Sequence, residues 1–342
     1  MTTKIIYPVY SMFALFALAS FALAQQAPER VSIRVITTFD YPGTGNATLP
    51  IKINDGRDIV GIYVDSSGVS RGFIRFGNGN FSAPIVDPND TCNSTSAEGI
   101  NNSRLICGVY QSGADCATPT LHGFFLMGHN FSDFDVPGFV NTQLFGVNNI
   151  GDFAGAVDDE TGFTSAFVSI GGAVTTFSVP GAISTAARQL NSSNQTAGTY
   201  VDSLEFAHSF WRDTDGTLHF PIDVPGSTST DLLGNNDSNW MVGRYGDSAG
   251  ITHGLFFIPP NKFVSFDYPG STFTSFNGIN AQGFICGRYT DASGIAHGFI
   301  ARIRGTPPTN EAGTEMKPYN SPSLVTPLNP SPSAWGGAMP AR

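Results

Sequence analysis

The chain has 342 residues with a formal net charge of −10, and only 13% of its residues are charged against 41% that are hydrophobic. Its 28 Phe and 10 Tyr can fill a large core, which excludes a disordered acidic chain. Gly and Pro supply 61 residues, and Asp outnumbers Glu by 21 to 6, a composition that favours turns over helices. With only four Lys, the chain lacks the basic clusters that bind nucleic acid or anionic membranes, so neither is expected as a partner.

The first residues predict export. Lys4 precedes an apolar run, and Ala22-Leu-Ala24 fits the small-x-small cleavage rule of a signal peptide. We therefore predict a signal peptide over residues 1–24 and a linker over 25–32. The alternative is an uncleaved anchor, but this apolar segment is barely long enough to span a bilayer and is interrupted by Pro8. Cleavage would leave a secreted or periplasmic protein without a membrane span.

The middle of the chain repeats one pattern six times. A recurring Gly lies at Gly61, Gly108, Gly155, Gly198, Gly243 and Gly287, and its 226-residue span in five steps gives a period of about 45. A recurring Asn lies at Asn54, Asn101, Asn148, Asn191, Asn235 and Asn280. Each repeat holds four β-like runs, here named a to d; in the last complete repeat they are Gly254–Ile258, Phe263–Asp267, Thr274–Ile279 and Phe284–Tyr289.

Four short strands in a repeat of this length are typical of one propeller blade. The predicted fold is therefore all-β: a six-bladed β-propeller of four-stranded antiparallel blades over residues 33–304. The repeats begin with a run b, Ile33–Asp40, and end with a run a, His297–Ile303. If run a is innermost, the C-terminal strand completes the first blade and closes the ring. Residues 305–342 contain eight Pro and no apolar period, which predicts a disordered tail.

The repeats resemble those of secreted bacterial proteins built from HAF repeats. The pattern is carried by Phe266–Gly270, Gly278–Asn280, Gly287–Asp291 and His297–Phe299, and in weaker form by the other five repeats. The third repeat departs most, with Ser165-Ala-Phe167 in place of His-Gly-Phe. The resemblance implies export and a repeat fold, but it implies no particular activity.

Few motifs point to chemistry. Gly246–Gly250 matches the serine nucleophile elbow in letters only, because that motif requires a strand-to-helix turn. Asp213–Gly216 resembles the start of a calcium loop, but Val224 stands where a bidentate Glu is required. No cofactor is therefore predicted, with calcium as a weak alternative. Asp158, Asp159 and Glu160 cluster in a d–a loop and are the predicted ligand-facing carboxylates.

One repeat column holds most of the histidines. The column reads Arg71, His122, Ser165, His208, His253 and His297. An Asp often precedes the His by six residues, so Asp–His contacts within a blade are predicted. The alternative is a ring of these side chains at the channel mouth that binds a metal or an anion. A residue needed once per blade favours the structural interpretation.

The cysteines separate into two pairs. Cys107 and Cys286 precede the recurring Gly, at positions where small apolar residues stand in other repeats. Cys92 and Cys116 lie in a b–c loop and a d–a loop of one repeat, which predicts a disulfide on one face.

The leading functional hypothesis is a secreted, non-enzymatic binding protein. Its ligand would be a glycan, an envelope component or a protein, bound at the face with the longer loops. The first alternative is an extracellular glycan lyase or hydrolase with Asp and His contributed by several blades. The second is a cell-surface structural protein. Binding by the irregular second and third repeats is predicted, because recurring columns build the blades.

Overall fold

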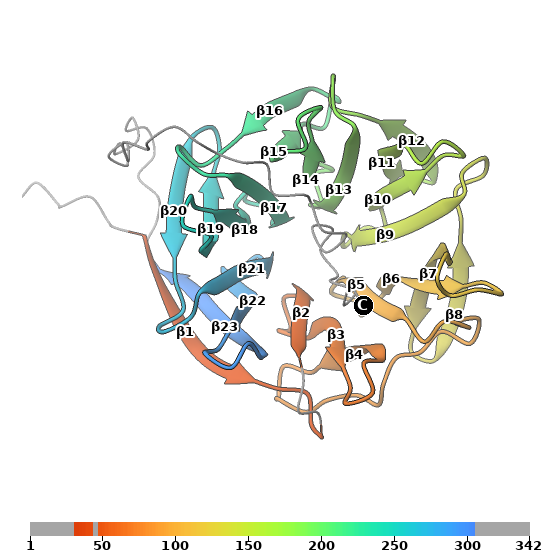
Figure 1. Cartoon of the computed structure of the whole chain (residues 1–342), viewed down its shortest axis with the longest axis horizontal. Coiled ribbons are helices and arrows are strands. Elements are labelled where there is room, and N and C mark those ends of the chain that lie inside the picture. Colours follow the sequence, from red (N-terminus) through yellow and green to blue (C-terminus); the bar gives the residue numbers. More distant parts are fainter. Residues whose placement is uncertain (1–30, 44–46, 305–342) are drawn as a thin grey trace, which may run out of the picture.

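The computed structural model describes residues 31–43 and 47–304. All regular structure in these residues is β-strand, and the strands form sheets arranged around a central axis, as in a β-propeller (Figure 1). These residues contain no helix that is long and apolar enough to cross a membrane. The predicted signal peptide, nearly all of the predicted linker and the predicted tail lie outside the described residues.

One strand order recurs around the axis: an inner strand pairs with a second strand, the second with a third, and the third with an outer strand. The inner strands are β2 (Thr48–Ile53), β5 (Thr95–Ile100), β9 (Asn141–Val147), β13 (Ser184–Leu190), β17 (Ser229–Asn235) and β21 (Phe273–Ile279). The second strands are β3 (Ile59–Val64), β6 (Ile106–Ser112), β10 (Phe153–Asp158), β14 (Thr196–Val201), β18 (Met241–Gly246) and β22 (Phe284–Thr290).

The third and outer strands complete each strand group. The third strands are β4 (Ser70–Arg75), β7 (Thr120–Met127), β11 (Thr164–Ile170), β15 (Ala207–Arg212), β19 (Thr252–Ile258) and β23 (Ala296–Arg304). The outer strands are β8 (Asn130–Phe134), β12 (Ala173–Phe177), β16 (Leu218–Ile222), β20 (Lys262–Phe266) and β1 (Ser32–Phe39). Beside β4, isolated bridges to Phe81 and Ile85 stand in place of an outer strand.

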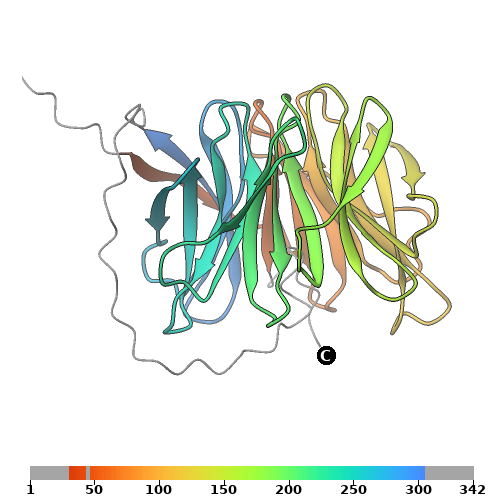
Figure 2. The ribbon, with the colours of Figure 1, turned by 90° about the horizontal axis from the view of Figure 1, so that it is seen from above.

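The molecule has two faces (Figure 2). The turn face carries the turns between inner and second strands, and the loop face carries the loops between second and third strands. Because antiparallel strands alternate in direction, the loops between outer and inner strands also lie on the loop face.

The prediction that run a is innermost is wrong, because run c supplies the strands nearest the axis (Figure 1). Contacts between inner strands continue around the axis, from β2 to β5 and finally from β21 back to β2. The inner strands pack so closely that a Cβ on Gly278 would lie 2.9 Å from the Cα of Lys52. Run a carries a recurring buried Phe, such as Phe299, which fits only farther from the axis.

The recurring Gly permits close packing within each group. A Cβ on Gly287 would collide with the backbone oxygen of Ser275 and would lie 2.7 Å from the ring of Phe299. The buried phenylalanines of the third strands therefore lie directly against the second strands. Hydrophobic clusters of this kind fill the space between neighbouring groups.

The two ends of the described chain meet in one sheet. β1 pairs antiparallel with β23, from Ser32 opposite Arg304 to Phe39 opposite Gly298. The expected pairing of the N-terminal run b with the C-terminal run a is therefore present. However, β23 is the third strand of the group that contains β21 and β22, and β1 forms its outer edge.

Candidate functional site

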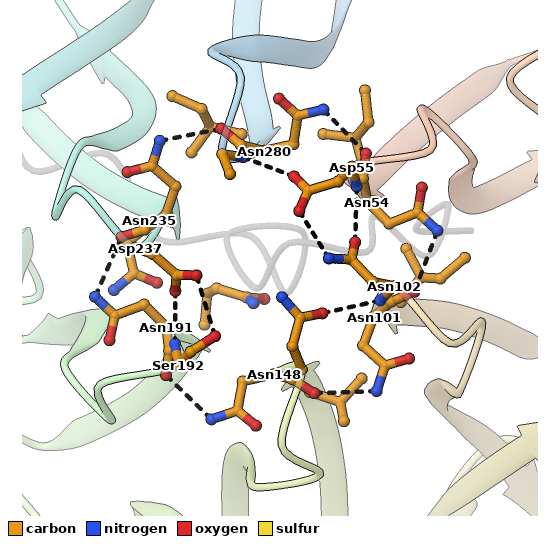
Figure 3. A pocket seen from close by; sticks show the side chains of 18 of the residues that line it. Asn54, Asp55, Asn101, Asn102, Asn148, Asn191, Ser192, Asn235, Asp237 and Asn280 are labelled. Carbon is orange, nitrogen blue, oxygen red and sulfur yellow. Dashed lines mark hydrogen bonds between the residues drawn. The ribbon is translucent and has the colours of Figure 1, made fainter.

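A closed ring of hydrogen bonds surrounds the axis at the turn face (Figure 3). One Asn follows each inner strand, and its side-chain amide donates to the backbone oxygen of the next such Asn at 3.0–3.1 Å. The order is Asn54, Asn101, Asn148, Asn191, Asn236, Asn280 and back to Asn54. The Oδ1 atom of each Asn also accepts the backbone N–H four residues later. One side chain thus closes its own turn and links two strand groups.

The fifth member of this ring is Asn236, not the predicted Asn235. Asn235 ends β17, and its side chain donates to the backbone oxygen of Gln195 at 2.9 Å. Two consecutive asparagines left the repeat position ambiguous in the sequence. The turn geometry resolves it, because only Asn236 accepts the N–H of Trp240.

The ring borders an open pocket at the axis, which we call the funnel. The residue after each ring Asn adds a second tier of polar contacts around it. Asp55 accepts the side-chain amide of Asn102 at 2.7 Å and the N–H of Ala281 at 2.9 Å, and Asp237 accepts the N–H of Ser192 at 2.7 Å. The polar groups of the funnel therefore bond to one another across neighbouring groups.

Deeper along the axis, every inner strand carries a β-bulge at the same place, three residues before the ring Asn. Bulges re-aim side chains, and here the bulged residues converge with Lys52 on one small cavity. They are Ile51, Glu98, Phe145, Arg188, Leu233 and Asn277, and all are buried. The Asn ring is uniform, whereas this tier differs in every repeat.

Three buried charges, Lys52, Glu98 and Arg188, line this cavity, and Asp231, Arg244 and Arg288 are buried on the inner and second strands; none of the six was predicted as a site residue. Each of Lys52, Glu98, Arg188, Asp231, Arg244 and Arg288 is at most 9% exposed. Lys52 Nζ donates to the backbone oxygen of Leu233 at 2.7 Å, and Arg244 pairs with Asp231 at 2.8 Å. Burial lowers the pKa of Lys52 to about 8 and raises the pKa of Glu98. For Glu98 and Arg188, the signal in the sequence was a column of unlike residues three positions before the recurring Asn.

The four histidines of the repeat column lie on third strands, away from the axis. Each Nδ1 lies 2.7–2.9 Å from the carboxylate that directly follows the adjoining outer strand, in the pairs His122–Asp135, His208–Asp223, His253–Asp267 and His297–Asp40. Three of them also contact the Asp six residues earlier at 3.3–3.4 Å. Each histidine is thus bonded within its own group and stacks on the recurring Tyr of the second strand.

The two remaining members of the column also have local partners. Arg71 forms an ion pair with Asp65, and Ser165 accepts a hydrogen bond from Ser178 at 3.2 Å. Although burial lowers the pKa of His297, its hydrogen bonds to Asp40 and Asp291 outweigh that effect and raise it. Within residues 31–43 and 47–304, no cluster of His, Cys, Asp and Glu has the geometry of a metal site.

The predicted ligand carboxylates lie on the loop face. Asp158 accepts hydrogen bonds from Asn141 at 2.9 Å and from Thr164 at 2.7 Å. Asp159 accepts the Thr161 hydroxyl and nearby backbone N–H groups, which lowers the pKa of its carboxyl. Glu160 is exposed. Two of the three carboxylates therefore hold the loop, and the third faces solvent.

The predicted disulfide between Cys92 and Cys116 is present, with the two Cα atoms 5.4 Å apart. It joins two loops of the group β5–β8 on the loop face. Asn141 links this group to the next one, because its side chain accepts the N–H of Leu121 and donates to Asp158, both at 2.9 Å. The two irregular repeats are therefore neighbours. Cys107 and Cys286 are buried free cysteines, at positions where small apolar residues stand in other repeats.

Four exposed apolar side chains lie in neighbouring loops of the loop face, and Glu160 belongs to the same loop as one of them, Phe163. We name the set Val140, Phe163, Ile183 and Leu204 the apolar loop surface; these side chains are 37–67% exposed. They come from two adjoining groups, β9–β12 and β13–β16, which are joined by the pairing of Thr164 with Ser184. The Val140 N–H donates to the backbone oxygen of Asp158, which places it next to the carboxylate loop.

Neither a protein-family model nor a curated protein matches the chain. Among solved structures it resembles TolB from Acinetobacter baumannii, at 11% identity and a TM-score of 0.43, covering 75% of this chain and 55% of that chain. It also resembles the β-propeller domain of the Trilobed protease from Pyrococcus furiosus, at 10% identity and a TM-score of 0.46, covering 78% of this chain and 86% of that chain. A third is the BP39L lectin from Burkholderia pseudomallei, at 12% identity and a TM-score of 0.39, covering 73% and 79%. The chain spans about half the length of the TolB structure, and these likenesses carry no conclusion about ligands.

Proposed function

We propose that the protein is an exported, non-enzymatic β-propeller that binds a protein partner through the apolar loop surface. The observation that carries this proposal is the exposure of Phe163, Leu204 and their two apolar neighbours on loops of two adjoining strand groups, with the exposed Glu160 in the same loop as Phe163. Patches of exposed apolar side chains rimmed by polar groups mark interaction sites on soluble domains. Glu160 and the acidic character of the chain favour a partner with a basic rim around an apolar centre.

A rigid scaffold is part of the proposal: the strand groups act as six blades of a ring that β1 closes. The hydrogen-bond ring that returns from Asn280 to Asn54 supports this arrangement, as does the pairing of β1 with β23. A closed ring holds the loops of neighbouring groups in fixed positions. Such preorganisation reduces the conformational entropy that is lost on binding.

Export to the periplasm or the medium is also proposed. The predicted signal peptide supports it, and so does the Cys92–Cys116 disulfide, because disulfides persist in oxidising compartments.

The test compares two matched substitutions on opposite faces. Leu204, 67% exposed, lies on the apolar loop surface, and Ile150, 65% exposed, lies on the turn face. The wild-type protein is used to capture partner proteins from the envelope and medium fractions. Each captured partner is identified, and the Kd of its complex with the wild-type protein is measured. Leu204→Asp should weaken binding at least tenfold, whereas Ile150→Asp should leave it unchanged. Equal effects of both substitutions, or binding to a glycan array in place of any protein, would contradict the proposal.

A further inference from the structure

One buried arginine lacks the carboxylate that its counterpart in the next group possesses. Arg244 on β18 lies opposite Asp231 on β17, and Nε and Oδ2 are 2.8 Å apart. Arg288 occupies the corresponding position on β22, but the residue opposite it on β21 is Ser275. The hydroxyl of Ser275 donates to Asn277 at 2.6 Å, so it is already engaged. The group that contains β17 and β18 therefore has an ion pair at this position. At the corresponding position in the group of β21 and β22, the guanidinium lies opposite a serine.

Arg288 is buried without a hydrogen-bonding partner. It is 9% exposed, and no hydrogen bond or ion pair joins it to another described residue. It contacts the face of the Phe273 ring, with Cζ 5.0 Å from the centroid. The nitrogen atoms of the Arg288 guanidinium are not fully shielded from solvent. A buried guanidinium without a counter-charge is unfavourable, so an anion bound to these nitrogens would stabilise Arg288.

The charges around Arg288 favour an anion as well. Arg244 lies over the same Phe273 ring, with its Cζ 5.9 Å from the ring centroid. Among residues 31–43 and 47–304, the charges buried near Arg288 include a second guanidinium, that of Arg244. Burial, and then the charge of Arg244, lowers the pKa of Arg288 to about 9.

We propose that the protein binds a small carboxylate ion at Arg288, in the place that the Asp231 carboxylate takes beside Arg244. A guanidinium presents two parallel N–H donors, which match the two oxygens of a carboxylate better than they match a spherical ion. The site is distinct from the apolar loop surface, since it is buried near the axis.

The first test measures the binding of acetate to the intact protein. The carbon-13 line of labelled acetate should broaden in the presence of wild-type protein and should remain sharp with Arg288→Gln. Arg302→Gln is the matched control, because Arg302 also stacks on a phenylalanine ring, Phe284 at 4.8 Å, but is exposed. This variant should bind acetate as the wild type does. Absence of broadening with wild-type protein, or equal broadening with Arg288→Gln, would overturn the proposal.

The second test supplies the missing carboxylate from the chain itself. Ser275→Asp recreates the Asp231–Arg244 pair, so acetate affinity should fall at least tenfold and the acetate-free protein should melt at a higher temperature. This variant keeps the proposal testable if Arg288→Gln fails to fold. Retained acetate affinity in Ser275→Asp would contradict the site, and displacement of acetate by equimolar chloride would contradict its carboxylate selectivity. Leu204→Asp should bind acetate as the wild type does, because Leu204 lies on the apolar loop surface and not at Arg288. This result would show that the Arg288 site and the partner surface can be tested independently.

Discussion

Asn280 donates a hydrogen bond of 3.0 Å to the backbone oxygen of Asn54, which lies 226 residues earlier in the chain. The Oδ1 atom of the same side chain accepts the N–H of Phe284 at 2.9 Å. One residue therefore shapes the turn after the last inner strand and joins that strand to the first. Asn54 itself is bonded onward to Asn101, so loss of one link weakens a continuous ring.

We predict that Asn280→Ala lowers the free energy of unfolding by about 2 kcal/mol, because it removes the bond to the Asn54 carbonyl and leaves the backbone N–H of Phe284 without its acceptor. Urea denaturation provides the measurement. Asn78→Ala is the control, since Asn78 accepts the N–H of Asn80 in an exposed turn. Its effect should stay below about 0.5 kcal/mol. Equal losses in both variants would show that the ring adds no stability of its own.

A second prediction concerns the outer strand β1. A chain that begins at Tyr41 loses β1 and exposes both the edge of β23 and the side of the core that Phe39 covers. We expect its melting temperature to fall by several degrees, since a core aromatic side chain contributes about 3 kcal/mol or more. A chain that ends at Arg304 should melt as the full chain does. Calorimetry compares the two, and similar melting of all three chains would refute a role for β1 in holding the fold.

A third prediction concerns the disulfide. Cys92 and Cys116 are 24 residues apart, and closure of such a loop stabilises by about 3 kcal/mol in the chain-entropy model. The double Cys→Ser variant should therefore lose about that amount in urea denaturation. A reducing agent should destabilise the wild type but not this variant. Free thiols at both positions in exported protein, found by non-reducing peptide mapping, would argue against the bond.

The fourth prediction uses the depressed pKa of Lys52, about 8 in the folded protein. The unfolded state keeps this proton to about pH 10.4, so stability rises with pH between the two values, where only the unfolded state is protonated. Lys52→Met removes this dependence. Its stability relative to wild type should therefore decline from pH 8 to pH 10, by up to about 3 kcal/mol.

Urea denaturation at several pH values measures this difference. Lys262→Met on the outer strand β20 controls for the loss of one lysine from the chain. A constant difference between Lys52→Met and wild type across this pH range would mean that Lys52 keeps its proton in the folded state.

The sequence alone was sufficient for features that depend on residues close together in the chain. The period of the repeats follows from local patterns of glycine, asparagine and β-like runs, and the strands agree with the expected runs to within two residues in the last repeat. The contact between Asp247 and His253 spans six residues and was predicted from spacing. The Cys92–Cys116 pairing was predicted because both loops belong to one repeat and one face.

The tertiary structure alone decided what depends on packing between repeats. The inner position of run c follows from the close approach of neighbouring strands, such as Gly278 against Lys52, which lie far apart in the chain. Asn236 rather than Asn235 both closes its own turn and donates to Asn280 in the next group, and only the folded chain shows the second bond. The lone charge of Arg288 is visible only once β21 places Ser275 opposite it. Sequence patterns report which residues recur, but burial and charge balance at the axis arise from several repeats meeting at one place.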